Sequence, residues 1–351
     1  MPEIIIGRRR EDLEKYGKEC TGFIGRHIVG KGDEAHLTVK VLMDFLRPHL
    51  VMVVGKRGSG KSYSGAVIAE EIVLLPEEYR KNLSVVMIDT MGIFWSMKYP
   101  NEEQLDLLHE WGLEPKGLGD RVKVFAPLSQ KKEFEEAGIE VDYGISVEPW
   151  RFEAEDWALA FNLPRTNPQA IALEKTINRL KERNEQFLID DIISEIKDDK
   201  EIDTHVKDAL VSMLTVANNW GVFGTEGIPI EEMLKPGIIS VFDVSHLRAT
   251  EAWSVRNLLV AMLARDIYQK RVIARRLEEL ERMGEIELKE RYPMVWMIVD
   301  ECHNFVGSEY ITASTEPFLT IVKQGRQPGI SLVAMTQMPN KLHPEVIAQT
   351  D

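Results

Sequence analysis

The segment with the clearest chemical potential is a glycine-rich run that ends in a lysine and a hydroxyl residue. It reads GKRGSGKSY and matches the spacing G-x-x-x-x-G-K-S. Glycines let backbone N–H groups face phosphate oxygens, and the positive end of a following helix favours the same anion. Lys61 is suited to reach the β- and γ-phosphates, and Ser62 to ligate Mg²⁺. The run predicts a site for ATP and Mg²⁺ made of Gly55, Lys56, Arg57, Gly58, Ser59, Gly60, Lys61, Ser62 and Tyr63.

A pair of carboxylates ends a strongly apolar run in VWMIVDECHNF, where Asp300 is followed by Glu301. Asp300 is suited to hold the metal shell, and Glu301 to act as general base on the water that attacks the γ-phosphate. In isolation two such acids would be solvated surface residues, but the glycine-rich loop upstream favours the catalytic interpretation. Cys302 is expected to be a buried small residue, since a neighbouring carboxylate raises the pKa of a thiol. His303 either positions Glu301 or is a structural histidine.

A second polar strand end follows in KQGRQPGISLVAMTQ, where an apolar run leads to Gln337. Gln337 is expected to sense or orient the γ-phosphate and the attacking water; the alternative is an ordinary turn residue. Arg326 precedes the same strand and is expected to stabilise charge on a phosphate, in its own subunit or in a neighbouring one. The alternative for Arg326 is an ordinary surface arginine.

The elements that must position these residues are short apolar runs that read as strands. They are nearly continuous in apolar residues, which is typical of strands buried on both faces of a parallel sheet. Helical spacing lies between them, as over Val255–Ile267, so the fold class expected is α/β with a mainly parallel central sheet covered by helices. The six predicted strands are His49–Val54, Ser84–Asp89, Arg121–Phe125, Ile238–Asp243, Met294–Asp300 and Ile330–Met335.

Two helical regions depart from this alternation. Residues 153–235 contain no convincing strand and carry helical spacing, which predicts a helical insertion. The helix that begins near Val255 carries a basic cluster, QKRVIARR, at Gln269–Arg276, and mixed charges beyond Arg276 predict an exposed projection that ends at Pro293. The cluster alone reads as a solvated surface.

Composition limits the class of protein. The chain has 351 residues with a formal net charge of −14, which argues against non-specific coating of nucleic acid but allows a local basic channel. No apolar run approaches the roughly 18 residues of a membrane span, and the N-terminus lacks the order of a secretory signal, so no membrane association and a cytoplasmic location are expected. Its 2 cysteines provide neither a disulfide framework nor a zinc site.

Five segments together resemble one family, the HerA–FtsK superfamily of RecA-like P-loop ATPases, and most of all its HerA branch. They are GKRGSGKS, VVMIDTMG, IISVFDVSHL, MVWMIVDECHNF and GRQPGISLVAMTQMPNKLHPEVIAQTD. The resemblance implies a RecA-like core, a homo-oligomeric and hexameric ring with ATP at subunit interfaces, and translocation of double-stranded DNA with a nuclease or other effector partner. It also implies that Arg326 corresponds to the family's arginine in the segment after the acidic pair. Asp89 would correspond to the aspartate that ends the family's second strand.

The chain departs from the family in four places. Residues 1–46 are shorter than the family's N-terminal barrel, which is expected to be reduced or replaced. The segment after Asp89 reads DTMGIFW, keeping Gly92 but losing the family's glutamate. Arg47 is the nearest match to a second arginine before the P-loop, without a firm offset. The chain stops at IAQTD, where the family continues, so a truncated C-terminus is expected. The ATPase core is assigned to residues 47–152 and 236–351.

Three functions remain open on the sequence. The first is an ATP-driven DNA translocase or helicase, which predicts Mg²⁺-dependent hydrolysis that duplex DNA stimulates. The second is an ATP-gated assembly scaffold for a partner enzyme, in which nucleotide changes the oligomeric state while DNA has no effect. The third is a motor for protein, like the related secretion ATPases, which basic pore loops in a ring would argue against. Fold and motor type alone do not fix the cargo.

Overall fold

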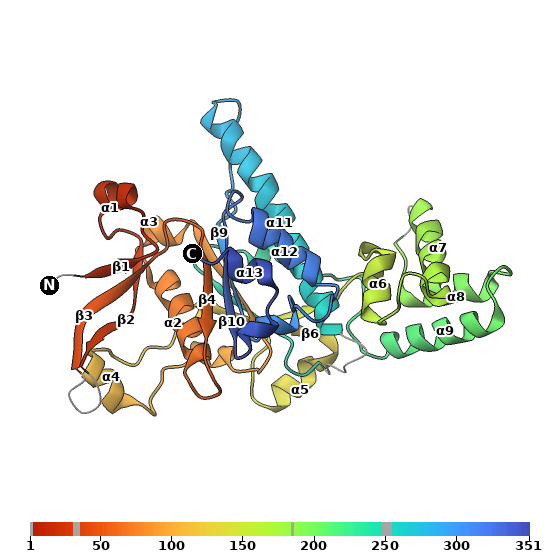
Figure 1. Ribbon diagram of the computed structural model, residues 1–351, viewed down its shortest axis with the longest axis horizontal. Coiled ribbons are helices and arrows are strands. Elements are labelled where there is room, and N and C mark those ends of the chain that lie inside the picture. The colour runs from red at the N-terminus through yellow and green to blue at the C-terminus, as the bar shows by residue number, and fades with distance from the viewer. Residues whose placement is uncertain (1–2, 31–35, 184–185, 248–254) are drawn as a thin grey trace.

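The central element of the molecule is a seven-stranded sheet in which every neighbouring pair of strands is parallel. The computed structural model describes residues 3–30, 36–183, 186–247 and 255–351. This architecture confirms the RecA-like α/β fold class, and all six predicted strands are present (Figure 1). In order across the sheet, the strands are β4 (Leu50–Val54), β10 (Ile330–Thr336), β9 (Met294–Val299), β5 (Leu83–Asp89), β8 (Ile239–Asp243), β6 (Val122–Pro127) and β7 (Tyr143–Ile145).

The central strands are apolar because both of their faces are covered. Every residue of β5, β8 and β10 is buried. Alternate residues of β5 belong to different cores: Val85 and Met87 pack with the side chains of α2 (Lys61–Leu74), whereas Val86 and Ile88 join the cluster around α11 (Val255–Arg282). Helices therefore cover both faces of the sheet, and the carboxyl ends of its parallel strands lie along one edge.

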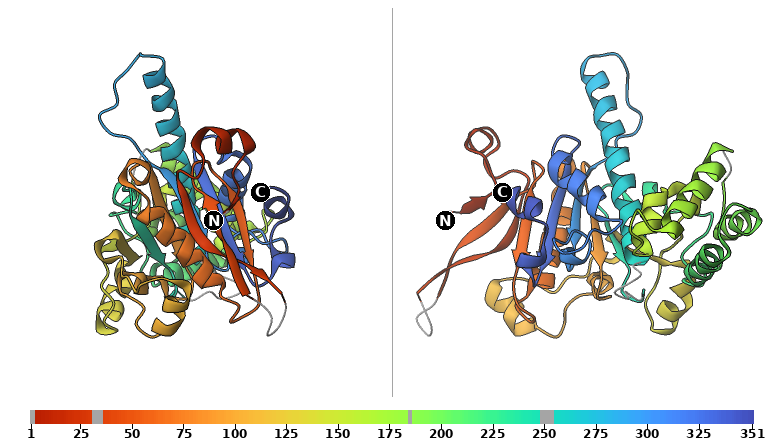
Figure 2. Two further views of the ribbon diagram at one scale, coloured as in Figure 1. Left: turned by 90° about the vertical axis from the view of Figure 1, so that its left-hand side faces the viewer. Right: turned by 45° about the vertical axis from the view of Figure 1, so that its right-hand side comes forward.

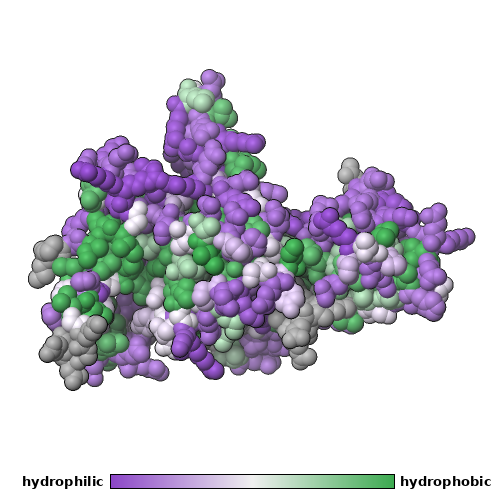
Figure 3. Space-filling model, in the orientation of Figure 1, coloured by the Kyte–Doolittle hydropathy of each residue, from purple (hydrophilic) through white to green (hydrophobic). Residues whose placement is uncertain are grey.

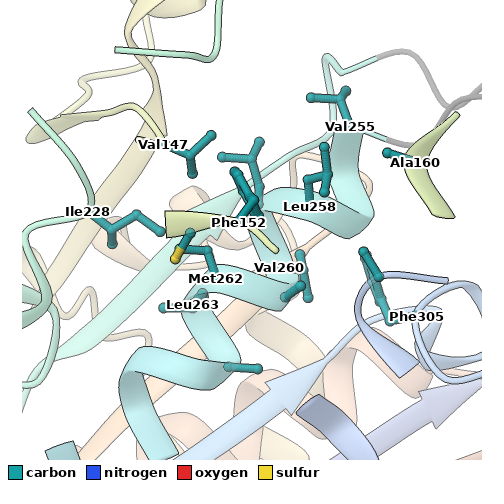
Figure 4. Packing of buried hydrophobic residues seen from close by; sticks show 14 of the residues in the cluster. Val147, Phe152, Ala160, Ile228, Val255, Leu258, Val260, Met262, Leu263 and Phe305 are labelled. Carbon is teal, nitrogen blue, oxygen red and sulfur yellow. The ribbon is translucent and has the colours of Figure 1, made fainter. Parts of the chain in front are cut away.

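The buried half of α11 forms the largest core. Leu258, Met262 and Leu263 lie close to Phe152 and belong to the same buried cluster, and Phe305 of the segment after β9 joins them (Figure 4). The core therefore packs the segment that follows the acidic pair against α11.

Beyond Ala274 the helix α11 extends past the sheet as an exposed projection (Figure 1). The projection confirms that part of the sequence prediction, but the helix ends at Arg282 rather than near Pro293. Gly284 has a φ of 78°, a left-handed conformation that a glycine adopts freely and that stops the helix. The projection is mainly hydrophilic, with hydrophobic residues near its tip (Figure 3).

The N-terminal residues form a separate small sheet that the sequence analysis did not predict. Its strands are β1 (Ile4–Ile6), β3 (His36–Asp44) and β2 (Thr21–Val29), in that order, with α1 (Arg10–Tyr16) between β1 and β2. This small sheet and the helical segment that follows β7 lie on opposite sides of the central sheet (Figure 2).

The helical segment between β7 and β8 packs on the central core through charge pairs as well as apolar contacts. Arg265 of α11 donates to both carboxylate oxygens of Asp156, at 2.7 and 2.5 Å. Arg151 pairs with Asp266 of the same helix. The segment comprises α6 (Ala154–Ala160), α7 (Pro168–Glu182), α8 (Ile189–Asp198), α9 (Thr204–Asn218) and α10 (Ile230–Met233).

The remaining helices are short and connect the larger elements. They are α3 (Glu77–Arg80), α4 (Leu105–Trp111), α5 (Lys131–Glu136), α12 (Thr315–Gln324) and α13 (Pro344–Ala348). Over the described residues, none of the helices combines the length and the apolar character that crossing a bilayer requires.

Candidate nucleotide-binding site

The carboxyl ends of four adjacent strands bring most of the predicted site residues to one edge of the sheet. The glycine-rich loop follows β4, Gln337 follows β10, Asp300 and Glu301 follow β9, and Asp89 ends β5. Strand β10 lies between the loop strand and the acidic strand, so Gln337 is delivered between the loop and Glu301. Parallel α/β sheets bind ligands at this edge.

The glycine-rich loop is shaped by glycines at the positions where a side chain would not fit. A Cβ at Gly55 would lie 2.1 Å from Ser59 Oγ. Gly60 has a φ of 85° and forms the left-handed N-cap of α2. The loop is closed by Ser59 N donating to Lys56 O at 3.1 Å and is tied to the neighbouring strand by Gly55 N donating to Thr336 O at 3.4 Å. Residues 56–60 are exposed, so the backbone of the loop faces solvent and is accessible to a phosphate.

Lys61 is the first residue of α2 and lies beneath this loop. Its side chain is 8% exposed, and its Nζ donates to Lys56 O at 3.3 Å. A phosphate in the loop would offer a stronger, charge-assisted partner to the same ammonium group. Ser62 is half-buried beside it, and Tyr63 is 55% exposed at the rim.

Asp300 is fixed in a buried position at the end of β9. It is 2% exposed, and Thr90 Oγ1 donates to its Oδ2 at 2.7 Å. Burial raises the pKa of this carboxyl and the neighbouring Glu301 adds to the rise, while the hydrogen bond from Thr90 and the charge of Lys61 oppose it. A cation at this position would relieve the cost of the buried charge, as expected of a metal-shell residue.

Glu301 adopts a strained backbone that turns its side chain toward the end of β10. Its φ is 44°, a left-handed conformation that costs an L-residue about 1–2 kcal/mol. Gln337 Nε2 donates to Glu301 Oε1. The other oxygen, Oε2, is buried without a hydrogen-bond partner, and the Nδ1 of His303 lies 3.4 Å from it. The contact with Gln337 thus orients the Glu301 carboxylate at the carboxyl edge, where a general base is expected.

His303 and Thr336 brace this arrangement. His303 Nδ1 lies 3.0 Å from Thr336 Oγ1, which also accepts from Met338 N at 2.9 Å. Burial lowers the pKa of His303, which favours the neutral ring. Cys302 is fully buried, and burial raises the pKa of its thiol to about 12, in agreement with a packing role.

Asp89 organises the turn after β5 and carries no free oxygen for a ligand. Its two carboxylate oxygens accept from four backbone N–H groups, those of Met91, Gly92, Ile93 and Phe94. Burial, together with the charge of Asp243 at the end of β8, raises the pKa of Asp89 to about 6. Asp89 therefore shapes the DTMG turn, which places Thr90 against Asp300.

Arg326 and Arg47 are not brought to this site. Both precede their strands, β10 and β4, and so lie at the amino edge of the sheet. The length of β10 separates Arg326 from Gln337 by roughly 20 Å at about 3.3 Å per residue. Arg326 is exposed, whereas Arg47 Nη2 donates to Asp12 Oδ1 at 2.7 Å.

The residues at the carboxyl edge fit a Mg²⁺–nucleotide complex rather than a metal held by protein alone. Among the described residues, no group of three or more His, Cys, Asp or Glu side chains could hold a metal ion. Mg²⁺ commonly binds through one carboxylate, a hydroxyl and substrate phosphates. Ser62 and Asp300 provide that donor set beside the glycine-rich loop.

Two residues of this edge were missed on the sequence, Thr90 and Thr336. Both are the polar residues at or just after the end of a buried strand, which is the signal that could have found them. Their partners, Asp300 and His303, come from distant parts of the chain, so the pairing required the strand order.

Residues 23–263 match the family model described as the central domain of the helicase HerA. The match includes the glycine-rich loop but ends before Asp300, Glu301 and Gln337. The chain is also 25% identical over 324 residues to the probable DNA double-strand break repair helicase HerA of Methanocaldococcus jannaschii, covering 84% of this chain. It spans 59% of the length of that relative.

Two solved structures align with most of the chain. VirB4 of Thermoanaerobacter pseudethanolicus has a TM-score of 0.48 and 15% identity, over 93% of this chain and 80% of that one. The bacterial conjugative coupling protein TrwB has a TM-score of 0.45 and 13% identity, over 85% of this chain and 68% of that one.

Proposed function

The chain belongs to the family of the HerA helicase central domain, and from that premise we propose that it is an ATP-hydrolysing ring motor that translocates double-stranded DNA. The observation that carries the proposal is the contact of Gln337 with Glu301 beside the glycine-rich loop, because it joins a candidate base and a polar sensor at one phosphate site. A P-loop alone would support nucleotide binding but not hydrolysis.

Each residue has a role that follows from its geometry. The backbone of residues 55–63 binds the phosphates, and Lys61 donates to the β- and γ-phosphate oxygens. Ser62 and Asp300 would hold Mg²⁺, which would supply charge neutralisation for the phosphate oxygens. Glu301 accepts the proton of the attacking water, while the hydrogen bond from Gln337 orients its carboxylate.

A ring explains why the arginine lies at the opposite edge. Since Arg326 is too far from its own loop, it acts on the nucleotide of a neighbouring copy, as a head-to-tail contact would allow. This supports the proposal of a homo-oligomer, hexameric by family resemblance. Arg326→Ala is then expected to lower hydrolysis about a hundredfold or more without weakening nucleotide binding to the altered chain itself.

DNA as the cargo rests on the family and on the name of the relative, which is a DNA double-strand break repair helicase. A nuclease or another effector is the partner that the family resemblance favours. We also propose that residues 153–235 are an insertion in the ATPase core of residues 47–152 and 236–351. The ion pairs of Arg151 and Arg265 support an insertion that moves with the core.

The deciding experiment measures ATP hydrolysis with Mg²⁺, with and without duplex DNA, alongside the mass of the particle with and without nucleotide. We expect hydrolysis that duplex DNA stimulates and a larger particle when ATP is bound. Lys61→Ala is the control for nucleotide binding. Hydrolysis that no DNA affects, with nucleotide still changing the particle mass, would favour the assembly scaffold and count against the translocase.

A further inference from the structure

A hollow lies between α11, α12 and the turn that leads into β10, and its lining is rich in cations. We call it the basic hollow. Helices α11 and α12 pack side by side here (Figure 1). Its lining includes Arg275, Arg276, Lys323, Gln324, Arg326 and Gln327, together with the acid Glu279, which pairs with Arg275. The hollow brings Arg326 together with the basic cluster at Gln269–Arg276. The candidate nucleotide-binding site does not use this cluster.

The basic residues of α11 differ in whether an acid already neutralises them. Lys270 pairs with Glu231 at 2.5 Å. Arg271 is 1% exposed and pairs with Glu278 at 3.2 Å. Arg275 pairs with Glu278 and with Glu279, at 3.4 and 3.3 Å.

Arg276 is the exception in this cluster. It is exposed, and within the described part of the chain no acidic side chain lies within ion-pair distance of it. The same holds for Arg326, on the other wall of the basic hollow. Lys323 has one acidic neighbour, Glu345, at the long distance of 3.9 Å. Two unpaired guanidinium groups facing one hollow repel each other, and an anion between them would remove that repulsion.

Neutral polar side chains also line the basic hollow. Tyr268 Oη donates to Gln324 Oε1 at 2.8 Å, and Gln327 adds a second amide to the lining. The acid of the lining, Glu279, pairs with Arg275, which leaves Arg276 and Arg326 as the cations able to bind a phosphate.

The distance between the two walls is fixed by Arg271. Its Nε donates to Pro328 O at 2.7 Å, and its Nη1 donates to Tyr292 O at 2.5 Å. The turn just after Arg326 is therefore attached to α11 one helical turn before Arg276. This buried brace holds the backbone of the two walls together, so less ordering is needed when an anion binds.

We propose that the basic hollow is a phosphate-binding site in which Arg276 acts together with Arg326. The phosphate belongs either to a nucleotide held by a second copy of the chain or to a DNA backbone. It does not belong to the chain's own nucleotide, because the hollow is at the amino edge of the sheet. Binding of phosphate at the hollow stands on its own geometry, and only the source of the phosphate rests on the proposed function.

The first test measures binding of inorganic tripolyphosphate by calorimetry in the Lys61→Ala chain, where the glycine-rich loop is disabled. Arg276→Ala is compared with Arg282→Ala, which removes an exposed arginine from the same helix outside the hollow. Loss of a charged hydrogen bond predicts affinity about tenfold to hundredfold weaker in Arg276→Ala alone. No binding to the Lys61→Ala chain, or equal affinity in both arginine variants, overturns the proposal.

The second test identifies the source. If the phosphate belongs to a neighbour's nucleotide, Arg276→Ala lowers ATP hydrolysis without DNA, and mixing it with the Lys61→Ala chain restores part of the rate. If the phosphate belongs to DNA, that rate is unchanged, while duplex binding weakens and its salt dependence becomes less steep. Behaviour identical to Arg282→Ala in both measurements overturns the proposal. A wild-type chain without ATP hydrolysis would refute the motor, but the tripolyphosphate result would still decide the hollow.

Discussion

The two edges of the central sheet carry different kinds of functional residue. At the carboxyl edge, polar side chains contact one another: Thr90 bonds Asp300, and Gln337 bonds Glu301. At the amino edge, Arg276 and Arg326 line one hollow without acidic partners among the described residues. The same strands build both edges, so the edges differ in whether their functional side chains already contact one another within the chain.

This difference is what a site divided between two neighbouring chains would produce. The carboxyl edge lacks only small ligands, because its side chains are already oriented by contacts within the chain. At the amino edge, Arg276 and Arg326 have no acidic side chain within ion-pair distance among the described residues, which is why we propose a phosphate there. A head-to-tail ring would satisfy both edges in one contact, whereas a monomer leaves the amino edge unsatisfied.

The largest expected effect comes from removing the charge of the candidate base. Glu301→Gln keeps the shape of the side chain but cannot accept a proton, so ATP hydrolysis should fall by a factor of about a hundred or more. ATP binding, followed with a fluorescent nucleotide, should persist. Glu309→Gln is the matched control, because that carboxylate is exposed and pairs with Lys341. Hydrolysis near the wild-type rate in Glu301→Gln would mean that another group at the carboxyl edge activates water.

The next effect concerns the contact that orients Asp300. Thr90→Val keeps the shape of residue 90 but removes the donor to Asp300 Oδ2. Loss of such a support typically costs about tenfold or more in metal affinity, so half-maximal hydrolysis should need correspondingly more Mg²⁺. Thr90→Ser retains the hydroxyl and should restore the wild-type requirement. An unchanged Mg²⁺ requirement in Thr90→Val would show that Asp300 needs no orienting partner.

The carboxyl edge could be predicted in large part because its residues sit in local patterns. The glycine-rich loop has fixed spacing, and Asp300 and Gln337 each follow an apolar run that reads as a strand. Six runs of this kind were enough to predict the parallel sheet. The N-terminal strands were missed because β2 and β3 are half-exposed and carry no continuous apolar run.

The amino edge could not be predicted for a different reason. Arg276 and Arg326 are far apart in the sequence, and neither lies in a pattern that distinguishes it from a solvated arginine. Of the cluster QKRVIARR, the structure uses Lys270, Arg271 and Arg275 in ion pairs. Only the position of α11 against the turn before β10 separates Arg276 from them. Strand order also decided that Arg326 lies away from its own loop.

A smaller effect is expected at the far end of the carboxyl edge, where Asp243 lies beside Asp89. Asp243 is fully buried, and its Oδ2 has no hydrogen-bond partner. Burial first, and then the charge of Asp243, raises the pKa of Asp89 to about 6 from its ordinary value of 3.8. A carboxyl whose pKa rises on folding stabilises the protein at low pH, and this stability is lost as the pH rises from the unfolded value through the folded one.

Asp243→Asn should therefore flatten the loss of stability between about pH 4 and pH 6. At pH 7 the free energy of unfolding, measured by urea titration, should rise, because the variant removes a charge that repels Asp89 and whose own pKa is raised by burial. Asp120→Asn is the control, because that side chain is fully exposed. A variant with the wild-type pH profile would indicate that Asp243 is already protonated when Asp89 is charged.

The smallest effect is expected from the substitution of Arg47, which allows two arginines of the amino edge to be compared. Arg47 lies at the same edge as Arg326, but two of its nitrogens already donate to Asp12. That hydrogen bond raises the pKa of Arg47 and lowers the pKa of Asp12, so the pair is charged and satisfied within the chain. Arg47→Ala should leave the hydrolysis rate nearly unchanged, whereas Arg326→Ala lowers it strongly. The two rates are to be compared at equal particle mass, with Asp12→Asn as a control that frees Arg47. If Arg47→Ala lowers the rate of hydrolysis as much as Arg326→Ala does, Arg47 must leave Asp12 to reach a neighbour's phosphate. Pairing within the chain would then not distinguish the arginines that act in hydrolysis from those that do not.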